Sequence, residues 1–392
     1  MLVRFDNSFN NINLDHRTYL KDVVSSTIHN QNSLVNCDTY SFIPSTRQTI
    51  DMNGDMLTQV KKLVSHFYPE LSPIRHIELD RISGAMTNAV YFVTIEQRRF
   101  VLRIYGHGCE VLLDRQKELE WLARLTPLRV GARLLGTFDN GRLEEYLPSK
   151  TLTNDCIRET NTSLQIAKLL AKLHSIVQFY PPSSSSSSSL EVWSCIYKWF
   201  HTLSVSDVFK NKNNDGFSIV GISLNDIKKC QQFLDKINPG NETVVFAHND
   251  LQYGNILRLN ANDELVAVDF EYAGYNPRSY DIANHFIEWQ YDYSSNDSAL
   301  AKAHKAPTVQ QQKLFLATYL EHHHLSSTTT LDQLWNEVNC WTMACHLYWG
   351  LWAFVQVLQS DIDFDYASYG TQRLNMFKQC FHTLLNGNLE LP

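Results

Sequence analysis

The sequence lacks an excess of positive charge. Its 392 residues include 34 Lys and Arg against 41 Asp and Glu, which gives a formal net charge of -7 at pH 7. The chain also contains no long basic block. A protein that binds a phosphate backbone needs clustered cations, so this composition argues against nucleic acid as a main partner.

Paired cysteines and targeting segments are also missing. The eight cysteines are scattered, with no Cys-x-x-Cys pair, so we expect free thiols in a reducing compartment rather than a zinc site. Residues 1–20 carry Asp and Asn throughout and no apolar stretch, so no secretory signal is expected there. Thr342, His346 and Gln356 interrupt the most apolar segment, residues 341–358. We therefore interpret that segment as a buried amphipathic helix rather than a membrane span.

The chain has enough apolar sequence for a substantial core, because 44% of its residues are hydrophobic and 19% are charged. Residues 1–36 are polar and rich in Asn, and we predict a variable extension. Residues 37–148 combine short β-branched runs with helical patterns at 56–67 and 112–125, and Asn140-Gly141 predicts a hairpin. A small sheet with one crossing helix is expected for this part.

Residues 149–392 are mainly helical in pattern, with a Ser-rich insert at 181–190 that we expect to be a surface loop without a catalytic role. The whole chain is therefore predicted to be α+β, with a sheet-rich first part and a helical second part. We find no internal repeats in the sequence.

Polar residues after one apolar strand suggest a reaction site. The string HNDLQYGN follows the predicted strand at 244–246 and contains Asp250 and Asn255. In phosphoryl transfer an Asp can orient a hydroxyl group, and an Asn carbonyl oxygen can bind a metal. Mg²⁺ prefers such hard oxygen ligands. Taken alone, a His-Asn-Asp sequence is usually a polar turn.

A second acidic motif, Asp269-Phe270-Glu271, follows the next apolar strand along the chain. A carboxylate here can bridge Mg²⁺ to nucleotide phosphates. Alone it is usually no more than the end of a strand. The order and spacing of the two motifs, after a sheet-rich first part, favour a shared site over chance.

Three strings carry a resemblance to a known family, in this order: HNDLQYGN, VDFEYAGYNPRSYDIANHFIEW and YWGLW. In these strings the chain resembles the choline/ethanolamine kinases, a group of protein-kinase-like small-molecule phosphotransferases. The resemblance covers roughly residues 39–377. It implies a two-lobed fold, with a small antiparallel-sheet N-lobe at 37–148 that binds nucleotide. The larger, mainly helical C-lobe at 149–392 would then bind substrate and carry the catalytic residues.

The resemblance also assigns site residues. It implies Asp250 as catalytic base, with Asn255 and Asp269 completing the catalytic set. The implied metal ligands are Asp269, Asn255 and Glu271. The implied nucleotide contacts are Ser83, Gly84, Ala85, Met86, Thr87, Asn88, Arg103, Glu145, Leu147, Gln252 and Asp269. The implied substrate contacts are Tyr272, Glu288, Tyr293, Trp349, Trp352 and Tyr369. His248 matches a position that usually braces the loop.

Two of these assignments depart from the usual kinase pattern or leave alternatives open. Arg103 occupies the strand position where protein kinases carry Lys, and Arg can bind phosphates bidentately. In kinases a carboxylate on the next helix holds this cation, and the spacing does not decide between Glu118 and Glu120. The alternative for each is a place on the solvated face of the helix, which is usual for a helical Glu. At the nucleotide loop, Ala85 stands where the family often has a second Gly.

The expected reaction is ATP-dependent phosphorylation of choline with Mg²⁺, which in this family is the cytoplasmic first step of phosphatidylcholine synthesis through CDP-choline. Trp349 and Trp352 share a helical face, and aromatic faces recognise a trimethylammonium group that has no N–H donors. For an arbitrary Trp pair, core packing would be the preferred interpretation.

The alternatives are an ethanolamine kinase or an enzyme that uses both alcohols, and more remotely an aminoglycoside kinase, a protein kinase or a catalytically inactive kinase-like binding protein. The resemblance leaves room for a homodimer.

Overall fold

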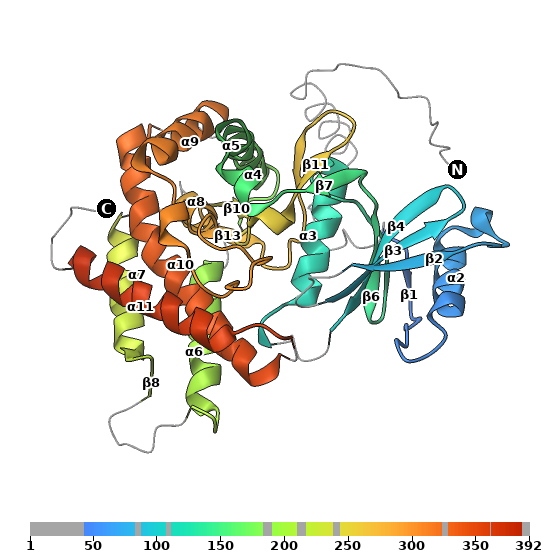
Figure 1. Cartoon of the computed structure of the whole chain (residues 1–392), viewed down its shortest axis with the longest axis horizontal. Helices are drawn as coiled ribbons and strands as arrows, with labels where there is room; N and C mark the ends of the chain where they lie inside the picture. Colours follow the sequence, from blue (N-terminus) through green and yellow to red (C-terminus); the bar gives the residue numbers. More distant parts are fainter. Residues whose placement is uncertain are drawn as a thin grey trace.

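Figure 1 shows the computed structural model of the chain, in which a sheet-based N-lobe adjoins a larger helical C-lobe. The structure describes residues 43–82, 88–106, 111–182, 190–209, 217–237, 244–323, 328–360 and 362–385. The predicted extension at 1–36, residues 83–87 of the nucleotide loop and residues 183–189 of the Ser-rich insert lie outside this described part. The predicted two-lobed α+β fold is confirmed.

The N-lobe is built on a six-stranded sheet with the order β1-β5-β6-β4-β3-β2. Its strands are β1 (Ser45–Thr46), β2 (Glu78–Ile82), β3 (Asn88–Ile95), β4 (Arg98–Tyr105), β5 (Leu134–Phe138) and β6 (Gly141–Glu145). Neighbours are antiparallel, except that the two-residue edge strand β1 is parallel to β5. The hairpin predicted at Asn140-Gly141 joins β5 to β6.

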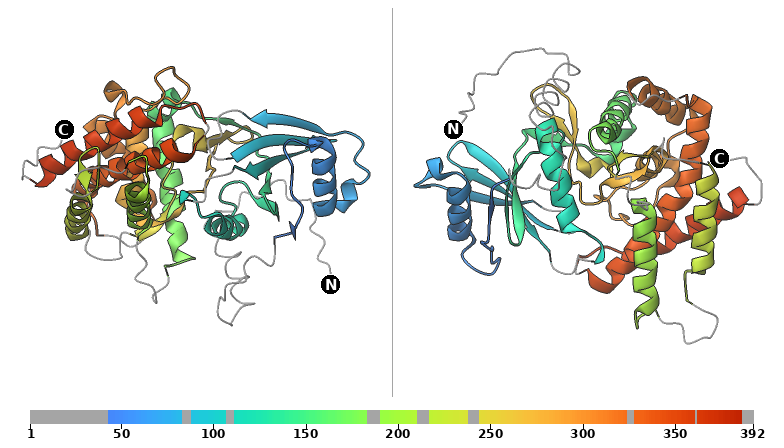
Figure 2. Two further views of the ribbon diagram at one scale, coloured as in Figure 1. Left: turned by 90° about the horizontal axis from the view of Figure 1, so that it is seen from below. Right: turned by 180° about the vertical axis from the view of Figure 1, so that it is seen from behind.

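Alternation along β4 separates an apolar face from a charged one. Phe100, Leu102 and Ile104 are buried against helix α2 (Met56–Phe67), as the period of two in a strand requires. Arg99 and Arg103 alternate with them and point to the other face. The second N-lobe helix, α3 (Arg115–Leu128), lies between the sheet and the C-lobe in Figure 1 and in the right view of Figure 2.

The chain leaves β6 and enters the C-lobe through residues 146–148. The sequence pattern predicts mainly helix after 149, but the first C-lobe element is a strand, β7 (Ser149–Thr151). It pairs with β11 (Ile256–Leu259), which in turn pairs with β12 (Leu265–Ala267). A second small pairing joins β10 (Val244–Ala247) to β13 (Gly274–Pro277). These short strands hold the loops that contain Asp250 and Asp269.

Helices make up most of the rest of the C-lobe. They are α4 (Asn154–Arg158), α5 (Thr160–His174), α6 (Glu191–Val205), α7 (Leu224–Ile237), α8 (Arg278–Glu288), α9 (Val309–His322), α10 (Leu331–Gln359) and α11 (Tyr366–Leu385). Helix α10 runs through this lobe in contact with α6, α8, α9 and α11 (Figure 2).

The apolar segment at 341–358 is the interior of α10, as predicted, but it is not amphipathic. Every residue from Met343 to Gln356 is buried, because helices pack around the whole circumference of this segment. A helix that is apolar all round is expected at the centre of a large core. Its N-terminus is fixed by a capping box between Thr330 and Gln333. None of the described helices is long and apolar enough to cross a membrane.

Candidate active site

The loop after β10 is held by a buried carboxylate on α8. Oδ2 and Oδ1 of Asp281 accept hydrogen bonds of 2.8 Å from the backbone N–H groups of His248 and Asn249. Asn249 has a φ of 67°, in the left-handed region that Asn tolerates better than most residues. Although burial opposes ionisation, the hydrogen bond from His174 and nearby histidines lower the pKa of Asp281. The loop is thus anchored by a buried, ionised group.

His248 connects the two predicted acidic motifs. Its Nε2 donates to the carbonyl oxygen of Val268 at 3.0 Å, and its Nδ1 accepts from the backbone N–H of Asp250 at 3.3 Å. This pattern requires one protonated nitrogen, and burial lowers the pKa of His248, so the ring is neutral. His248 therefore links the backbone before Asp269 to the backbone at Asp250.

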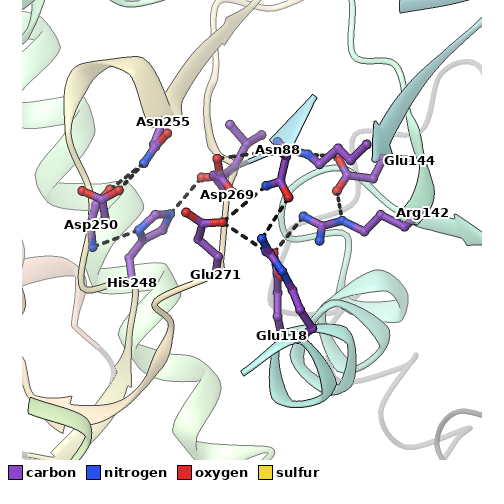
Figure 3. Close-up of polar contacts among 12 residues, drawn as sticks. Asn88, Glu118, Arg142, Glu144, His248, Asp250, Asn255, Asp269 and Glu271 are labelled. Atoms are coloured by element: carbon purple, nitrogen blue, oxygen red, sulfur yellow. Dashed lines mark hydrogen bonds and ion pairs between the residues drawn. The ribbon is translucent and has the colours of Figure 1, made fainter. Parts of the chain in front are cut away.

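Asp250 and Asn255 lie together, at either end of the same loop (Figure 3). Nδ2 of Asn255 donates to both the backbone oxygen and Oδ2 of Asp250, each at 2.9 Å. This leaves the amide oxygen of Asn255 for another partner. Burial raises the pKa of Asp250 well above its usual range, and the charges of Glu288, Asp269 and Glu271 raise it further. The site therefore concentrates negative charge, which favours cationic ligands.

Asp269 receives an arginine from the N-lobe. Nη1 of Arg103 donates to Oδ2 of Asp269 at 3.2 Å, and Nε of Arg103 donates to Glu144 at 3.1 Å. Burial opposes ionisation of Asp269, but Arg103 and Arg142 lower its pKa, so it is a carboxylate. Oδ1 of Asp269 is buried and makes no hydrogen bond within the described part of the chain.

A chain of alternating charges continues from this pair into the N-lobe (Figure 3). Arg142, which is fully buried, binds Glu144 at 2.5 Å and Glu118 at 2.8 Å. Arg115 binds Glu118 at 2.9 Å and Glu271 at 3.2 Å, which returns the chain to the C-lobe. Each buried charge thus has opposite charges beside it, as burial requires.

The expectation that Glu118 or Glu120 pairs with Arg103 is wrong. Glu118 pairs with Arg115 and Arg142, while Glu120 accepts a hydrogen bond from Gln116 on the helix surface. Sequence reasoning missed Arg142 and Glu144, which occupy the strand next to Arg103. No local signal could have found them, because Arg142 lies opposite Arg103 through the pairing of β6 with β4, whereas the hairpin at Asn140-Gly141 sets only the register of β6 with β5.

The predicted metal ligands suit a hard cation. Carboxylate oxygens of Glu118, Asp269 and Glu271 lie within 4.8 Å of one another. The unpartnered Oδ1 of Asp269 and the amide oxygen of Asn255 add donors of the type that Mg²⁺ prefers. Asp269 and Glu271 are each paired with an arginine at 3.2 Å, and Oδ1 of Asp269 has no hydrogen-bond partner in the described part of the chain.

The other predicted nucleotide residues divide into three groups. Residues 83–87 lie outside the described part of the chain. Asn88, which follows them, contacts Glu271 at 3.4 Å and Arg115 at 2.9 Å, so this end of the loop reaches the acidic site. The side chain of Glu145 pairs with Arg133, and that of Gln252 accepts from the backbone of Gly254.

Leu147 lies in the segment between β6 and β7, where its carbonyl oxygen accepts a hydrogen bond from Ser149. Because the carboxylate of Glu145 is engaged by Arg133, a nucleotide contact at this segment would involve backbone groups.

The six predicted substrate residues come together in the C-lobe. Nε1 of Trp352 donates to the hydroxyl of Tyr272 at 2.9 Å, and the rings of Trp349 and Trp352 meet edge to face at 5.2 Å. The ring centre of Tyr369 lies 6.4 Å from that of Trp352. The hydroxyl of Tyr293 donates to Glu288 at 2.7 Å. We call Tyr272, Tyr293, Trp349, Trp352 and Tyr369 the aromatic wall.

Further members of this region were not predicted. The ring centres of Tyr366 and Trp352 lie 5.6 Å apart, and Asn284 accepts a 2.7 Å hydrogen bond from Trp349. Asn284 also donates to the backbone of Asn249, so it links the aromatic wall to the loop of Asp250. Only the helical spacing of Asn284 from Asp281 could have suggested this link.

Comparison with known proteins identifies relatives over most of the chain. The family model for choline/ethanolamine kinase matches residues 79–378. The chain is 31% identical over 303 residues to a probable choline kinase 2 of Arabidopsis thaliana, covering 76% of this chain and 83% of that protein. It is 32% identical over 342 residues to a probable ethanolamine kinase A of Dictyostelium discoideum, covering 83% and 92%.

Solved structures support the fold independently. A choline kinase from Cryptosporidium parvum superposes with a TM-score of 0.68 at 24% identity, covering 85% of this chain and 98% of that one. An ethanolamine kinase from Plasmodium vivax gives a TM-score of 0.66 at 23% identity, covering 85% and 92%. The chain therefore belongs to the choline/ethanolamine kinase family, and with it to the phosphotransferases of protein-kinase-like fold.

Proposed function

We propose that this protein transfers the γ-phosphoryl group of ATP to the hydroxyl group of choline, giving phosphocholine and ADP. The observation that carries the proposal is the set of contacts made by Tyr272. Its carbonyl oxygen accepts a 2.7 Å hydrogen bond from Asn249, next to Asp250, and its hydroxyl accepts from Trp352 in the aromatic wall. It also follows Glu271 directly in the chain and lies three residues after Asp269. One residue thus joins the loop for the reaction to the surface for the substrate cation.

Asp250 would orient the choline hydroxyl for in-line attack and accept its proton. The hydrogen bonds from Asn255 fix the direction of the Asp250 carboxylate. Burial raises the pKa of Asp250, and a cationic alcohol beside it would stabilise the ionised form that this role requires.

Arg103 would hold the phosphates of ATP from β4, next to the nucleotide loop. Asp269, with Asn255 and Glu271, would hold Mg²⁺, which when bound neutralises charge that develops on the phosphoryl oxygens. Because Arg103 already contacts Asp269, the two groups that would flank the phosphates are adjacent before ATP arrives.

The preference for choline rests on the number of rings around a buried carboxylate. A trimethylammonium group gains about 0.5–2 kcal/mol from each aromatic face and needs no acceptors. The ammonium of ethanolamine needs acceptors for three N–H groups. One oxygen of Glu288 already accepts from Tyr293, and the hydroxyl of Tyr272 already accepts from Trp352. The wall therefore suits methyl groups better than N–H donors.

An ethanolamine kinase is the second candidate, because a relative named as a probable ethanolamine kinase is as similar as those named as choline kinases. An ATP-coupled assay over ethanolamine, its monomethyl and dimethyl derivatives and choline separates the two. We expect kcat/KM to rise with each added methyl group. The reverse order would favour ethanolamine, and binding of Mg-ATP with no phosphorylated product would favour an inactive binding protein.

We also propose that this reaction takes place in the cytoplasm, at the start of phosphatidylcholine synthesis, as the family resemblance implies. Fractionation of cells that express the tagged protein, with labelled choline as tracer, tests them together. We expect labelled phosphocholine to form only in the cytosolic fraction.

A further inference from the structure

Arg373 on α11 lies behind the aromatic wall and is completely buried. Its guanidinium carbon lies 5.4 Å from the ring centre of Tyr369 and 5.4 Å from that of Tyr291. Nη2 donates to the carbonyl oxygen of Cys345 on α10 at 3.1 Å. Nη1 lies 3.8 Å from Oε1 of Glu288, at the C-terminal end of α8. One side chain thus contacts three of the segments that form the wall.

A structural role explains this arginine poorly. A buried guanidinium normally satisfies its donors with several hydrogen bonds, because desolvation of the charge is costly. Within the described part of the chain, Nε and Nη1 of Arg373 make no hydrogen bond. Its charge is compensated mainly by Glu288 at a distance too long for a hydrogen bond, and by the faces of two tyrosines.

The surroundings of Glu288 indicate the role of the Arg373 charge. The titratable groups that interact with Glu288 are Arg373 and Tyr369 on α11, Tyr293 and Tyr291 after α8, Cys345 on α10 and Asp250. Arg373 is the cation among them. Burial raises the pKa of Glu288 above its usual value, and Arg373 and the hydroxyl of Tyr293 offset part of this rise. Without the arginine, a carboxyl 2% exposed to solvent would be neutral over a wider pH range.

We propose that Arg373 is a positioning residue that keeps Glu288 ionised and holds the Tyr369 ring in place, and thereby sets the affinity of the site for cationic alcohols over neutral ones. This inference rests on the proposed function. The distance of 3.8 Å suits the role, since the carboxylate is stabilised without being tied by a direct hydrogen bond, and remains available to a substrate cation.

The position of Arg373 also indicates which rings of the aromatic wall attract the substrate cation most strongly. A ring with an arginine on one face attracts a second cation less strongly, because both cations interact with the same quadrupole. Tyr369 therefore acts mainly as a spacer between Arg373 and the substrate. Trp349 and Trp352 supply the main ring attraction, and Glu288 supplies the charge.

The test compares choline with 3,3-dimethylbutan-1-ol, an uncharged alcohol of the same shape, in the wild type and in Arg373→Met. Methionine keeps a long apolar side chain but removes the charge. We expect the ratio of choline affinity to neutral-alcohol affinity to fall about tenfold in the variant, with the ATP KM unchanged. The choline KM of both proteins should rise as the pH is lowered. In Arg373→Met this rise should begin at a higher pH than in the wild type, because Glu288 takes up its proton at a higher pH.

A purely structural role predicts a different result. In that case the affinities for both alcohols and for ATP would change together, and the pH at which choline binding weakens would stay the same. This result would overturn the proposal. Arg373→Lys serves as the conservative variant, because it restores the charge without the planar fork, and it should recover most of the affinity ratio.

If Arg373→Met does not fold, Glu288→Gln alone carries the test: its ratio of choline affinity to neutral-alcohol affinity should fall, and an unchanged ratio would overturn the proposal. If Arg373→Met folds, a double variant adds a second comparison. Glu288→Gln removes the group through which Arg373 is proposed to act, so Arg373→Met added to Glu288→Gln should cause no further loss of choline selectivity. A further loss there would contradict the proposal. Failure of the proposed function is recognised separately, since wild-type protein would then bind choline no better than its neutral analogue.

Discussion

Arg103 on β4 and Asp269 on the loop after β12 are 166 residues apart in sequence and form an ion pair of 3.2 Å. The pair joins the N-lobe sheet to the C-lobe loops at the point where nucleotide phosphates and metal are proposed to bind. Glu144 holds the other side of Arg103, so the guanidinium is oriented before a nucleotide arrives. Preorganisation of this kind is how a kinase stabilises the charge of a transferring phosphoryl group.

Replacement of Arg103 should therefore weaken nucleotide binding selectively. We expect Arg103→Met to raise the ATP KM about tenfold or more and to leave the choline KM within about twofold, because the loss is confined to phosphate contacts. Steady-state kinetics with each substrate varied in turn measure both constants.

Arg99 provides a matched control, since it lies on the same strand and face but stacks over Phe92 and Tyr146. Arg99→Met should leave the ATP KM near that of the wild type. If the two variants behaved alike, loss of the sheet rather than loss of phosphate binding would be responsible.

The aromatic wall should matter for the alcohol and not for ATP. Trp352→Ala removes a ring and the donor to Tyr272, and we expect the choline KM to rise about tenfold, in keeping with the strength of one cation–π contact and its support. The ATP KM should change little. Isothermal titration calorimetry with choline and with an ATP analogue measures the two affinities directly.

Trp335 on the same helix is the control, because it contacts Gln312 and Lys313 away from the wall. Trp335→Ala should leave the choline KM unchanged. Equal effects of Trp352→Ala on both substrates would identify Trp352 as a core residue instead.

His285 makes folding stability depend on pH. Burial lowers the pKa of His285 to about 4 from its usual 6.5. Its Nδ1 donates to Leu251, and its Nε2 accepts from Trp289, so a second proton would oppose an N–H group. Between these pKa values the unfolded chain binds the proton and the folded chain does not. Stability is therefore complete above about pH 6.5 and falls with pH, by up to about 3 kcal/mol from this residue.

Urea unfolding at a series of pH values measures this dependence. In His285→Gln the free energy of unfolding should fall less steeply between about pH 6.5 and about pH 4.5, whatever its value at neutral pH. Parallel pH dependences for the two proteins would show that His285 is not responsible.

Much of the fold was predictable because its signals are local. The Asn140-Gly141 turn fixes a hairpin, and the alternation in β4 separates a core face from a charged face. The loops of Asp250 and Asp269 follow apolar strands, which indicates that their polar residues lie at strand ends. These signals require no knowledge of distant contacts.

The rest depends on contacts between distant segments. Hydrophobic periodicity counts Arg142 and Glu118 as exposed, but the structure buries both, because each neutralises the other. Likewise, the burial of α10 on all sides follows from the helices packed around it and not from its own pattern. The role of Tyr272 as a link is invisible in sequence, since its partners Asn249 and Trp352 lie far away on either side.

The measurement that bears most directly on the proposed reaction is phosphorus NMR of ATP, Mg²⁺ and choline with the wild type and with Asp250→Asn, which keeps the shape and the contact with Asn255. Wild-type protein should produce phosphocholine and ADP in equal amounts. Asp250→Asn should slow this by about 10³-fold, the scale of a lost general base, while it binds ATP as tightly as the wild type. Undiminished phosphocholine production by Asp250→Asn would contradict the account.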